Sequence, residues 1–133
     1  MNLEILKIAS NTKNFKDLKK YTHYSKSRNP LCGDEIHIKL VINNQKITDF
    51  GYQGKSCIYC QATASILSNK LVNFETIKIR DLCEYANAYF GENKNNLKKE
   101  WRFLTKLLSQ KNAPRKQCIL LPFNALKKIV SKL

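Results

Sequence analysis

Four side chains that could share one metal ion come from three separate segments of the chain: Cys32, Asp34, Cys57 and Cys118. The first two lie in Asn-Pro-Leu-Cys-Gly-Asp, the third follows Gly-Lys-Ser, and the last follows Arg-Lys-Gln. Three thiolates and a carboxylate can form a four-coordinate metal site. The spacing is not decisive, because Cys-X-Asp is a weak pattern. The residues alone leave two interpretations open, a metal site or three unrelated cysteines.

The positions of two cysteines favour the thiolate form, which is the form of sulfur that binds metals and attacks other sulfur atoms. Cys57 precedes a predicted helix, and Cys118 lies at or just before another. The positive end of a helix dipole stabilises negative charge there. Arg115 and Lys116 add positive charge near Cys118.

The remaining cysteines and both histidines are assigned other roles. Cys83 falls in an apolar helical stripe and is predicted to be a small core residue. Cys60, one turn after Cys57, is also interpreted as a core residue; the alternative is that it supplements the site or takes a persulfide from Cys57. His37 alternates with apolar strand residues and is predicted to be solvated, and His23 lies in a polar arm. Neither histidine fits as a fourth ligand.

The elements that must position these residues are indicated by hydrophobic periodicity. Residues 36–42 alternate between apolar and polar side chains, which predicts a half-buried strand, and residues 46–52 form the returning strand. Asn43 and Asn44 supply the turn. This antiparallel hairpin carries the Cys-Gly-Asp segment at its entry and leads to Cys57 at its exit. Residues 21–28 are expected to form an edge strand or an ordered arm.

Apolar stripes at helical spacing predict helices in the rest of the chain. They are expected over residues 3–9, 58–71, 79–90 and 97–108. A last helix is expected to start close to Pro122, because proline is tolerated in a first helical turn. The chain is predicted to be one α+β domain over residues 1–133, with a small antiparallel sheet packed against several α-helices.

Composition points to a cytoplasmic protein with no membrane contact. No apolar run approaches the roughly 20 residues that a membrane span needs, and the N-terminus does not resemble a signal peptide. Five cysteines is an odd number and does not suggest a disulfide framework. Metal or thiol chemistry is the better interpretation in a reducing compartment.

The net charge of +14 suits an acidic partner, and every charged residue after Glu100 is basic. The alternative explanation is compositional, because lysine is abundant throughout the chain. Nucleic acid is the less favoured partner, since no motif interleaves aromatic with basic residues.

The chain resembles the U-type iron–sulfur cluster assembly proteins, IscU, SufU and the N-terminal domain of NifU. Residues 29–34 resemble that family's Asn-Pro-X-Cys-Gly-Asp segment, and residues 47–57 resemble the strand that leads to its second cysteine. Residues 62–65 resemble its Ala-Ser-Ala-Ser run, and residues 115–126 resemble the segment around its third cysteine. The resemblance covers most of the chain, residues 5–132.

The resemblance implies a SufE/NifU-like fold and a scaffold that builds a transient [2Fe–2S] cluster. The family pattern gives Cys32, Asp34, Cys57 and Cys118 as the ligands of the cluster, or of Zn²⁺ in the resting protein. It implies a cysteine desulfurase as the sulfur source and apo iron–sulfur proteins as recipients. Cys118 and Cys32 are the candidate persulfide acceptors. A scaffold is not expected to be an enzyme. Sulfurtransferase-like activity is expected only if the protein passes sulfur on.

One departure from the IscU type supports a second interpretation. The IscU type has a histidine directly before its last cysteine, where this chain has Gln117, so the chain leans towards the SufU or NifU branches. Some SufU-like relatives pass sulfur on and use zinc to hold the site. The second interpretation is therefore a zinc-dependent persulfide acceptor for a cysteine desulfurase.

A third interpretation, from another class, is a zinc-stabilised nucleic-acid-binding module, motivated by the charge of +14. Its weakness is that Cys57 and Cys60 form one Cys-X-X-Cys pair and no second pair follows. The basic surface around Cys118, including Lys127 and Lys128, is instead predicted to dock an acidic desulfurase.

Overall fold

The structure is a computed structural model that describes residues 2–91 and 98–133. Its α-helices are α1 (Leu3–Ala9), α2 (Ile58–Lys70), α3 (Thr76–Tyr89) and α4 (Lys116–Val130). Its strands are β1 (His23–Arg28), β2 (Glu35–Asn43) and β3 (Lys46–Lys55), and two 3-10 helices are η1 (Lys99–Leu104) and η2 (Gln110–Arg115). The strands form one antiparallel sheet in the order β1-β2-β3, so the predicted α+β fold is confirmed.

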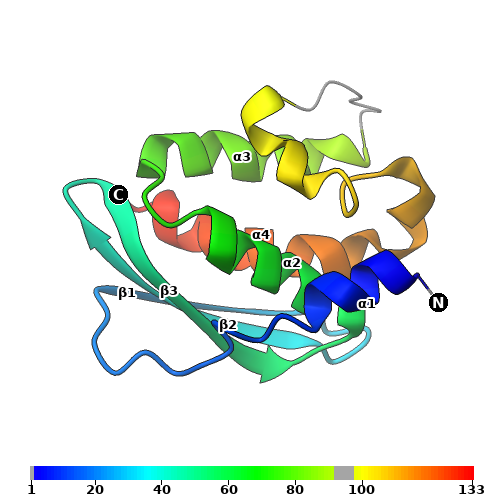
Figure 1. The fold of residues 1–133 in the computed structure, drawn as a ribbon, viewed down its shortest axis with the longest axis horizontal. Coiled ribbons are helices and arrows are strands. Elements are labelled where there is room, and N and C mark those ends of the chain that lie inside the picture. The colour runs from blue at the N-terminus through cyan, green and yellow to red at the C-terminus, as the bar shows by residue number, and fades with distance from the viewer. Residues whose placement is uncertain (1, 92–97) are drawn as a thin grey trace.

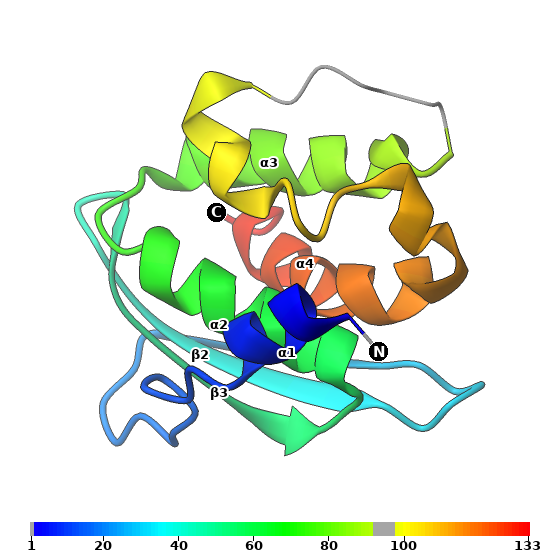
Figure 2. The ribbon, with the colours of Figure 1, turned by 45° about the vertical axis from the view of Figure 1, so that its right-hand side comes forward.

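The elements are stacked in layers on one face of the sheet (Figures 1 and 2). The sheet forms one outer layer, α1, α2 and α4 lie over it, and α3 with η1 lies on the side of these helices away from the sheet. Helix α4 is central, because it packs against the sheet, α2 and α3. The apolar core fills the space between these layers.

The alternation predicted for β2 is present in the structure. Ile36, Ile38 and Leu40 are fully buried towards the helices, whereas the side chains between them face the open side of the sheet. Such alternation is expected when one face of an antiparallel sheet is covered and the other meets solvent. The segment predicted as an edge strand or arm is the edge strand β1, which pairs with β2.

The turn between β2 and β3 lies one residue beyond the predicted position. Asn44 and Gln45 are its central residues and have φ values of 52° and 64°. Two central residues with positive φ are typical of the two-residue hairpin turn whose twist matches its flanking strands. Asparagine tolerates this conformation, which is why the turn was detectable from the sequence.

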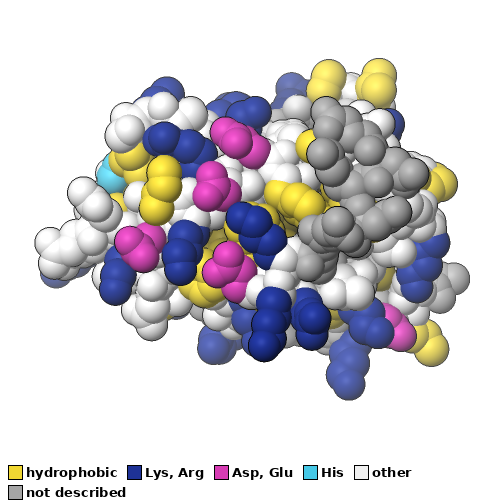
Figure 3. All heavy atoms as spheres, turned by 90° about the horizontal axis from the view of Figure 1, so that it is seen from above, with side chains coloured by type: hydrophobic (Ala, Val, Ile, Leu, Met, Phe, Trp, Pro, Cys, Tyr) yellow, Lys and Arg dark blue, Asp and Glu magenta, His cyan; other side chains and the backbone are white. Residues whose placement is uncertain are grey.

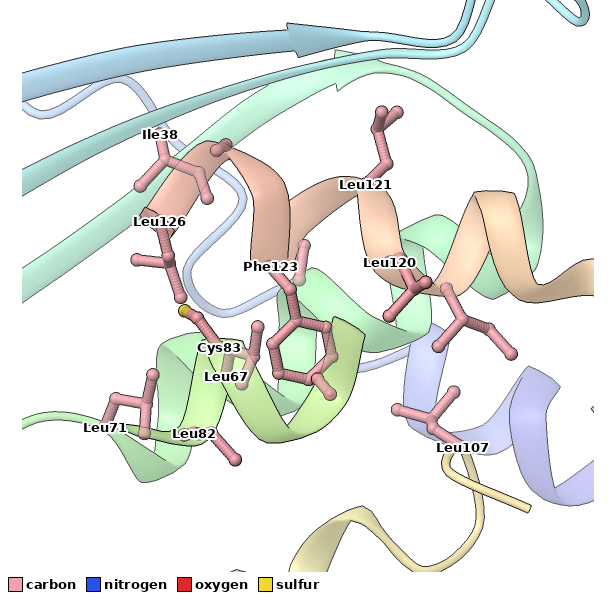
Figure 4. Packing of buried hydrophobic residues seen from close by; sticks show 14 of the residues in the cluster. Ile38, Leu67, Leu71, Leu82, Cys83, Leu107, Leu120, Leu121, Phe123 and Leu126 are labelled. Carbon is pink, nitrogen blue, oxygen red and sulfur yellow. The ribbon is translucent and has the colours of Figure 1, made fainter. Parts of the chain in front are cut away.

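The core around α4 includes Cys83, as predicted. Phe123 of α4 points towards α3 and lies close to Leu67, Leu82 and Cys83 (Figure 4). The Cys83 side chain is fully buried, and this burial raises the pKa of its thiol to about 12. Cys83 therefore behaves as a small apolar residue of the core.

The predicted start of the last helix was wrong. Helix α4 begins at Lys116, six residues before Pro122, so the proline lies inside the helix. Pro122 has no N–H to donate to the Cys118 carbonyl one turn earlier, a loss that typically costs about 3 kcal/mol or more. The helix tolerates it because most of its residues, including Pro122, are buried against the other layers.

The helix predicted over residues 97–108 is also corrected. Trp101, Leu104 and Leu108 are buried, as their spacing predicted, but they lie in and after the 3-10 helix η1. Trp101 has φ −110° and ψ 16°, which interrupts regular helical geometry. Residue 97 lies outside the described part of the chain. The hydrophobic pattern correctly predicted which side chains are buried but not the type of helix.

The face over α3 and η1 carries both signs of charge. Figure 3 shows lysine and arginine side chains interspersed with carboxylates there. Lys78 and Glu100 form one such pair, at 3.9 Å. The surplus of positive charge is therefore partly offset on this face. Among residues 2–91 and 98–133, no helix combines the length and hydropathy that crossing a bilayer requires.

Gly54 fixes the path of β3 towards the start of α2. It pairs with Ile36 of β2 and has φ +145°, a conformation that favours glycine. A Cβ at this position would lie 2.1 Å from the Glu35 carbonyl oxygen, a backbone atom that cannot move independently. The close approach of these two strands therefore requires glycine.

We expect Gly54→Ala to lower the free energy of unfolding by at least about 2 kcal/mol, because it combines backbone strain with a clash. Urea denaturation followed by circular dichroism measures this. Gly91→Ala is the matched control: its new Cβ would be 3.9 Å from the nearest atom, the Ala88 carbonyl oxygen. It should change the free energy by no more than about 0.5 kcal/mol. Equal effects of the two substitutions would contradict the account of Gly54.

Candidate metal centre

The loop between β1 and β2 is closed by hydrogen bonds from and to Asn29. The Asn29 N–H donates to the Asp34 carbonyl oxygen at 2.8 Å, and its own carbonyl accepts from the Gly33 N–H at 2.8 Å. Its side-chain oxygen accepts from the Leu31 N–H at 3.0 Å. Gly33 has φ +79°, which lets the chain turn back at this point. The loop thus holds Cys32 and Asp34 in a short, defined turn.

Three of the four predicted donors come together in space. The sulfur atoms of Cys32 and Cys118 and a carboxylate oxygen of Asp34 all lie within 4.8 Å of one another. Cys32 is exposed, whereas Asp34 and Cys118 are 9% and 7% exposed. The cluster therefore has one side open to solvent and two donors embedded in the protein. Residues 32 and 118 meet because α4 packs on β1 and β2, the strands that flank the loop.

The fourth predicted donor, Cys57, lies beside this group at the start of α2. Its backbone N–H donates to Asp34 Oδ2 at 3.2 Å, which links the loop before β2 to the helix after β3. Cys57 is the N-cap residue of α2, but its side chain makes no capping hydrogen bond. Its thiol is therefore not used by the helix. The sulfur falls outside the set of three donors that lie within 4.8 Å of one another.

The protonation of Cys118 differs from the expectation based on the helix dipole. Burial, followed by the neighbouring Cys57, Asp34 and Cys32, raises the pKa of the Cys118 thiol well above its usual range. Loss of solvation and nearby anionic groups both disfavour a thiolate. A bound cation reverses this balance, because metal ligation deprotonates a thiol. The electrostatics of the cluster therefore suit a positively charged occupant.

Cys60 is close to the cluster in sequence but is buried in the core. Its side chain is fully buried, and burial is the main cause that raises the pKa of its thiol to about 12. Cys57, Asp34 and Cys32 raise this pKa further, while a hydrogen bond with Ser56 lowers it. These effects show that Cys60 adjoins the cluster, yet its sulfur is not among the grouped donors. The first interpretation of Cys60, as a core residue, fits this placement.

Both histidines lie away from the cluster. His37 is on the open face of the sheet, where Nδ1 is 2.6 Å from the Tyr24 hydroxyl and Nε2 is 3.2 Å from a Glu35 oxygen. His23 is half-buried at the start of β1, with Nδ1 2.8 Å from the Thr22 hydroxyl. Neither contributes to the grouped donors.

The basic residues at the two ends of α4 are separated. Arg115 and Lys116 are exposed beside Cys118, and the Arg115 guanidinium lies 5.2 Å from the centroid of the Tyr59 ring. Lys127 and Lys128 lie near the other end of the helix. Ten residues of helix correspond to about 15 Å. Lys127 and Lys128 therefore lie well away from Cys118 along the helix, and Arg115 and Lys116 are the basic residues beside it.

Sequence reasoning missed the role of Asn29. It ligates nothing in the cluster but positions the two donors of the loop through three hydrogen bonds. The available signal was the Asn-Pro pair, because asparagine side chains accept hydrogen bonds from backbone N–H groups two residues on and so nucleate turns.

Comparison with known proteins identifies the family. The family model described as the NifU-like N terminal domain matches residues 2–86. The iron–sulfur cluster assembly scaffold protein IscU of Thermotoga maritima is 29% identical over 127 residues, which are 93% of this chain and 88% of that protein. IscU of Streptococcus pyogenes serotype M1 is 24% identical over 105 residues, 78% of this chain and 66% of that protein.

Solved structures share the fold over nearly the whole chain. A nitrogen-fixing NifU-like protein (N-terminal) from Brucella abortus has a TM-score of 0.88 at 20% identity, covering 98% of this chain and 92% of that one. FiSufU, a protein of the SUF system from Fervidobacterium islandicum AW-1, has a TM-score of 0.86 at 17% identity, covering 96% and 94%. The chain therefore belongs to the NifU-like N-terminal domain family of iron–sulfur cluster assembly scaffolds.

Proposed function

We propose that this chain builds a transient [2Fe–2S] cluster on Cys32, Asp34, Cys57 and Cys118 and passes it to apo iron–sulfur proteins. The observation that carries the proposal is the grouping of the Cys32, Asp34 and Cys118 donors within 4.8 Å. Two thiolates on one tetrahedral zinc lie about 3.8 Å apart, because each Zn–S bond is about 2.3 Å. The observed spacing is therefore close to what shared ligation requires.

Cys57 completes the proposed ligand set. It is tied to Asp34 through its backbone N–H at 3.2 Å, and its side chain interacts with the Cys118 thiol. Thiolate ligands are also those that iron–sulfur clusters commonly use.

Asp34 is the ligand whose exchange would let the site release a bound cluster. A carboxylate is a harder ligand than a thiolate and suits soft iron–sulfur centres less well. Asp34 also accepts a hydrogen bond from the Cys57 N–H, so it has an alternative partner when it leaves the metal. A scaffold has to hold a cluster strongly enough for assembly and weakly enough for transfer.

A cysteine desulfurase is the proposed sulfur donor, delivering persulfide sulfur to the open side of the site. Of the two candidate acceptors, Cys32 is exposed, whereas Cys118 is buried and the pKa of its thiol is raised. We therefore place first contact with the donor at Cys32. Arg115 and Lys116, exposed beside Cys118, provide positive charge for an acidic partner surface.

A second candidate function is zinc-dependent sulfur transfer, in which zinc holds the site and Cys32 accepts sulfur. It is favoured by Gln117 at the position where the IscU type has a histidine, and by the exposure of Cys32. The two functions differ in whether iron and sulfide assemble on the protein.

We expect anaerobic reconstitution of the parent chain to give visible charge-transfer bands and matched iron and sulfide contents. Cys118→Ser should weaken both, because it removes a buried thiol donor. Cys83→Ala is the matched control, since it removes a thiol from the core without touching the cluster. Absorbance with iron, zinc and sulfide analysis measures the outcome. Tightly held zinc with no sulfide would favour sulfur transfer, and no bound metal in the parent would contradict both functions.

We expect Asp34→Ala to retain a reconstituted cluster longer than the parent, because the exchangeable carboxylate is lost. The decay of the visible bands in the presence of a chelator measures the lifetime. Asp34→Asn is the control, because its side-chain oxygen can still accept the hydrogen bond from the Cys57 N–H. Faster loss in Asp34→Ala than in the parent would count against the release role.

We expect Cys60→Ser to leave the bound metal and the sulfur accepted from a desulfurase unchanged, because Cys60 is buried and its thiol remains protonated. Cys57→Ser, one turn earlier on α2, should reduce both. Metal analysis and mass spectrometry of persulfide adducts measure these outcomes. A loss in Cys60→Ser equal to that in Cys57→Ser would make Cys60 part of the site.

A further inference from the structure

The face of the sheet that points away from the helices combines aromatic with basic side chains. Three neighbouring rows of this open face, each crossing β1, β2 and β3 in turn, are Tyr24, Lys39 and Gly51; Lys26, His37 and Gln53; and Arg28, Glu35 and Lys55. Alternate residues of a strand point to the same face, so β1 alone places one tyrosine and two basic residues there. This interleaving is not visible as a motif of adjacent residues in the sequence.

The chain before β1 crosses one end of the open face and leaves a hollow beside it. Leu18 packs where Gly51 has no side chain, since a Cβ on Gly51 would lie 2.8 Å from Leu18 Cγ. Asp17 binds the Lys39 ammonium group and so ties this segment to β2. The hollow has a volume of about 360 Å³, within the range of small ligand pockets. Its lining is Asp17, Tyr21, Tyr24, His37, Lys39 and Gln53.

Two tyrosine rings border the hollow and remain half in solvent. Tyr21 is 48% exposed and Tyr24 is 47% exposed. The Tyr24 hydroxyl lies 2.6 Å from His37 Nδ1, and the Lys39 ammonium group lies 4.5 Å from the centroid of the Tyr21 ring. Rings that are already held in place lose little conformational entropy when a ligand packs on them. Unpaired nucleic-acid bases stack on exposed aromatic side chains of this kind.

Basic residues next to these rings give the open face its charge. Lys26, Arg28 and Lys55 are exposed, and in the described part of the chain none of them lies within 4.0 Å of a carboxylate. Glu35, which is 3.2 Å from His37, is the one carboxylate within the three rows and offsets one of these charges. The rows therefore keep a positive surplus that suits a phosphate backbone.

We propose that the open face of the sheet binds single-stranded nucleic acid. One base lies in the hollow against the Tyr21 and Tyr24 rings, and the phosphates lie along Lys26, Arg28 and Lys55. A single strand fits because its bases are free to stack on the protein, whereas the bases of a duplex are already stacked on one another.

Two further features favour a nucleic acid over an acidic protein at this face. An acidic protein would account for the basic residues but not for two fixed, exposed rings beside a hollow. Gln53 adds an exposed amide to the lining, and an amide can both donate to and accept from the edge of a base. This binding surface goes beyond the proposed cluster function and does not depend on it.

The test is fluorescence anisotropy of a labelled oligouridylate of about ten nucleotides, a length within the site sizes of single-strand binders. Titration with the full chain at low salt should give saturable binding. Three phosphate contacts predict that the logarithm of the association constant falls with the logarithm of the salt concentration with a slope of about −2. The same strand paired with its complement should bind at least about fivefold more weakly, because its bases no longer stack on the protein.

Four variants separate stacking from charge. Tyr24→Leu removes the ring but keeps an apolar side chain, and it should weaken binding at least about fivefold, the lower end of the effect of one stacked base. Tyr24→Phe keeps the ring and should bind within about twofold of the parent. Lys26→Gln should weaken binding and make the salt slope shallower by about 0.7. Lys70→Gln makes the same charge change at the end of α2, in the helix layer, and should alter neither quantity.

Any of four results would overturn the proposal. Binding that does not saturate would remove the site, and equal weakening by Lys70→Gln and Lys26→Gln would show that the charge acts diffusely. Equal affinities of Tyr24→Leu and Tyr24→Phe would leave the rings without a role. Polyglutamate that binds the parent as tightly as the oligouridylate does would assign the open face to an acidic protein instead.

Discussion

The donors of the candidate metal centre repel one another once they are ionised, and the protein has to hold them together against that repulsion. Cys32, Asp34 and Cys118 have donor atoms within 4.8 Å, and two of these residues are largely buried. Burial and these neighbours raise the pKa of the Cys118 thiol, which disfavours its ionised form. With a cation the same crowding becomes favourable, since every donor is then attracted to the shared charge.

The fold opposes this repulsion by attaching each donor to a different rigid element. Hydrogen bonds of Asn29 close the loop that carries two donors, and the Cys57 N–H fixes the Asp34 carboxylate at the start of α2. Helix α4 brings the last cysteine to them because its buried side packs on both the sheet and α2. Gly54 allows β3 to approach β2 just before the chain reaches Cys57.

The same helix gives its two ends different environments. Its first turn carries Cys118 beside the other donors, and its last turns carry lysines beside β1. One element thus connects the candidate metal centre with a lysine-rich end, about 15 Å apart along the helix.

The sequence by itself determined the strand pairing of the β2–β3 hairpin, most of the buried positions and the donor types, because alternation, helical stripes and ligand chemistry are local properties. It misplaced the start of α4 and the helix type near Trp101, since burial there outweighs the local preferences of proline and of helical spacing. Only the tertiary structure decided that Cys118 meets the Cys32 loop, and that burial and its neighbours raise the pKa of the Cys118 thiol. These properties depend on desolvation and on distances between segments far apart in the chain, and neither quantity is encoded in local spacing.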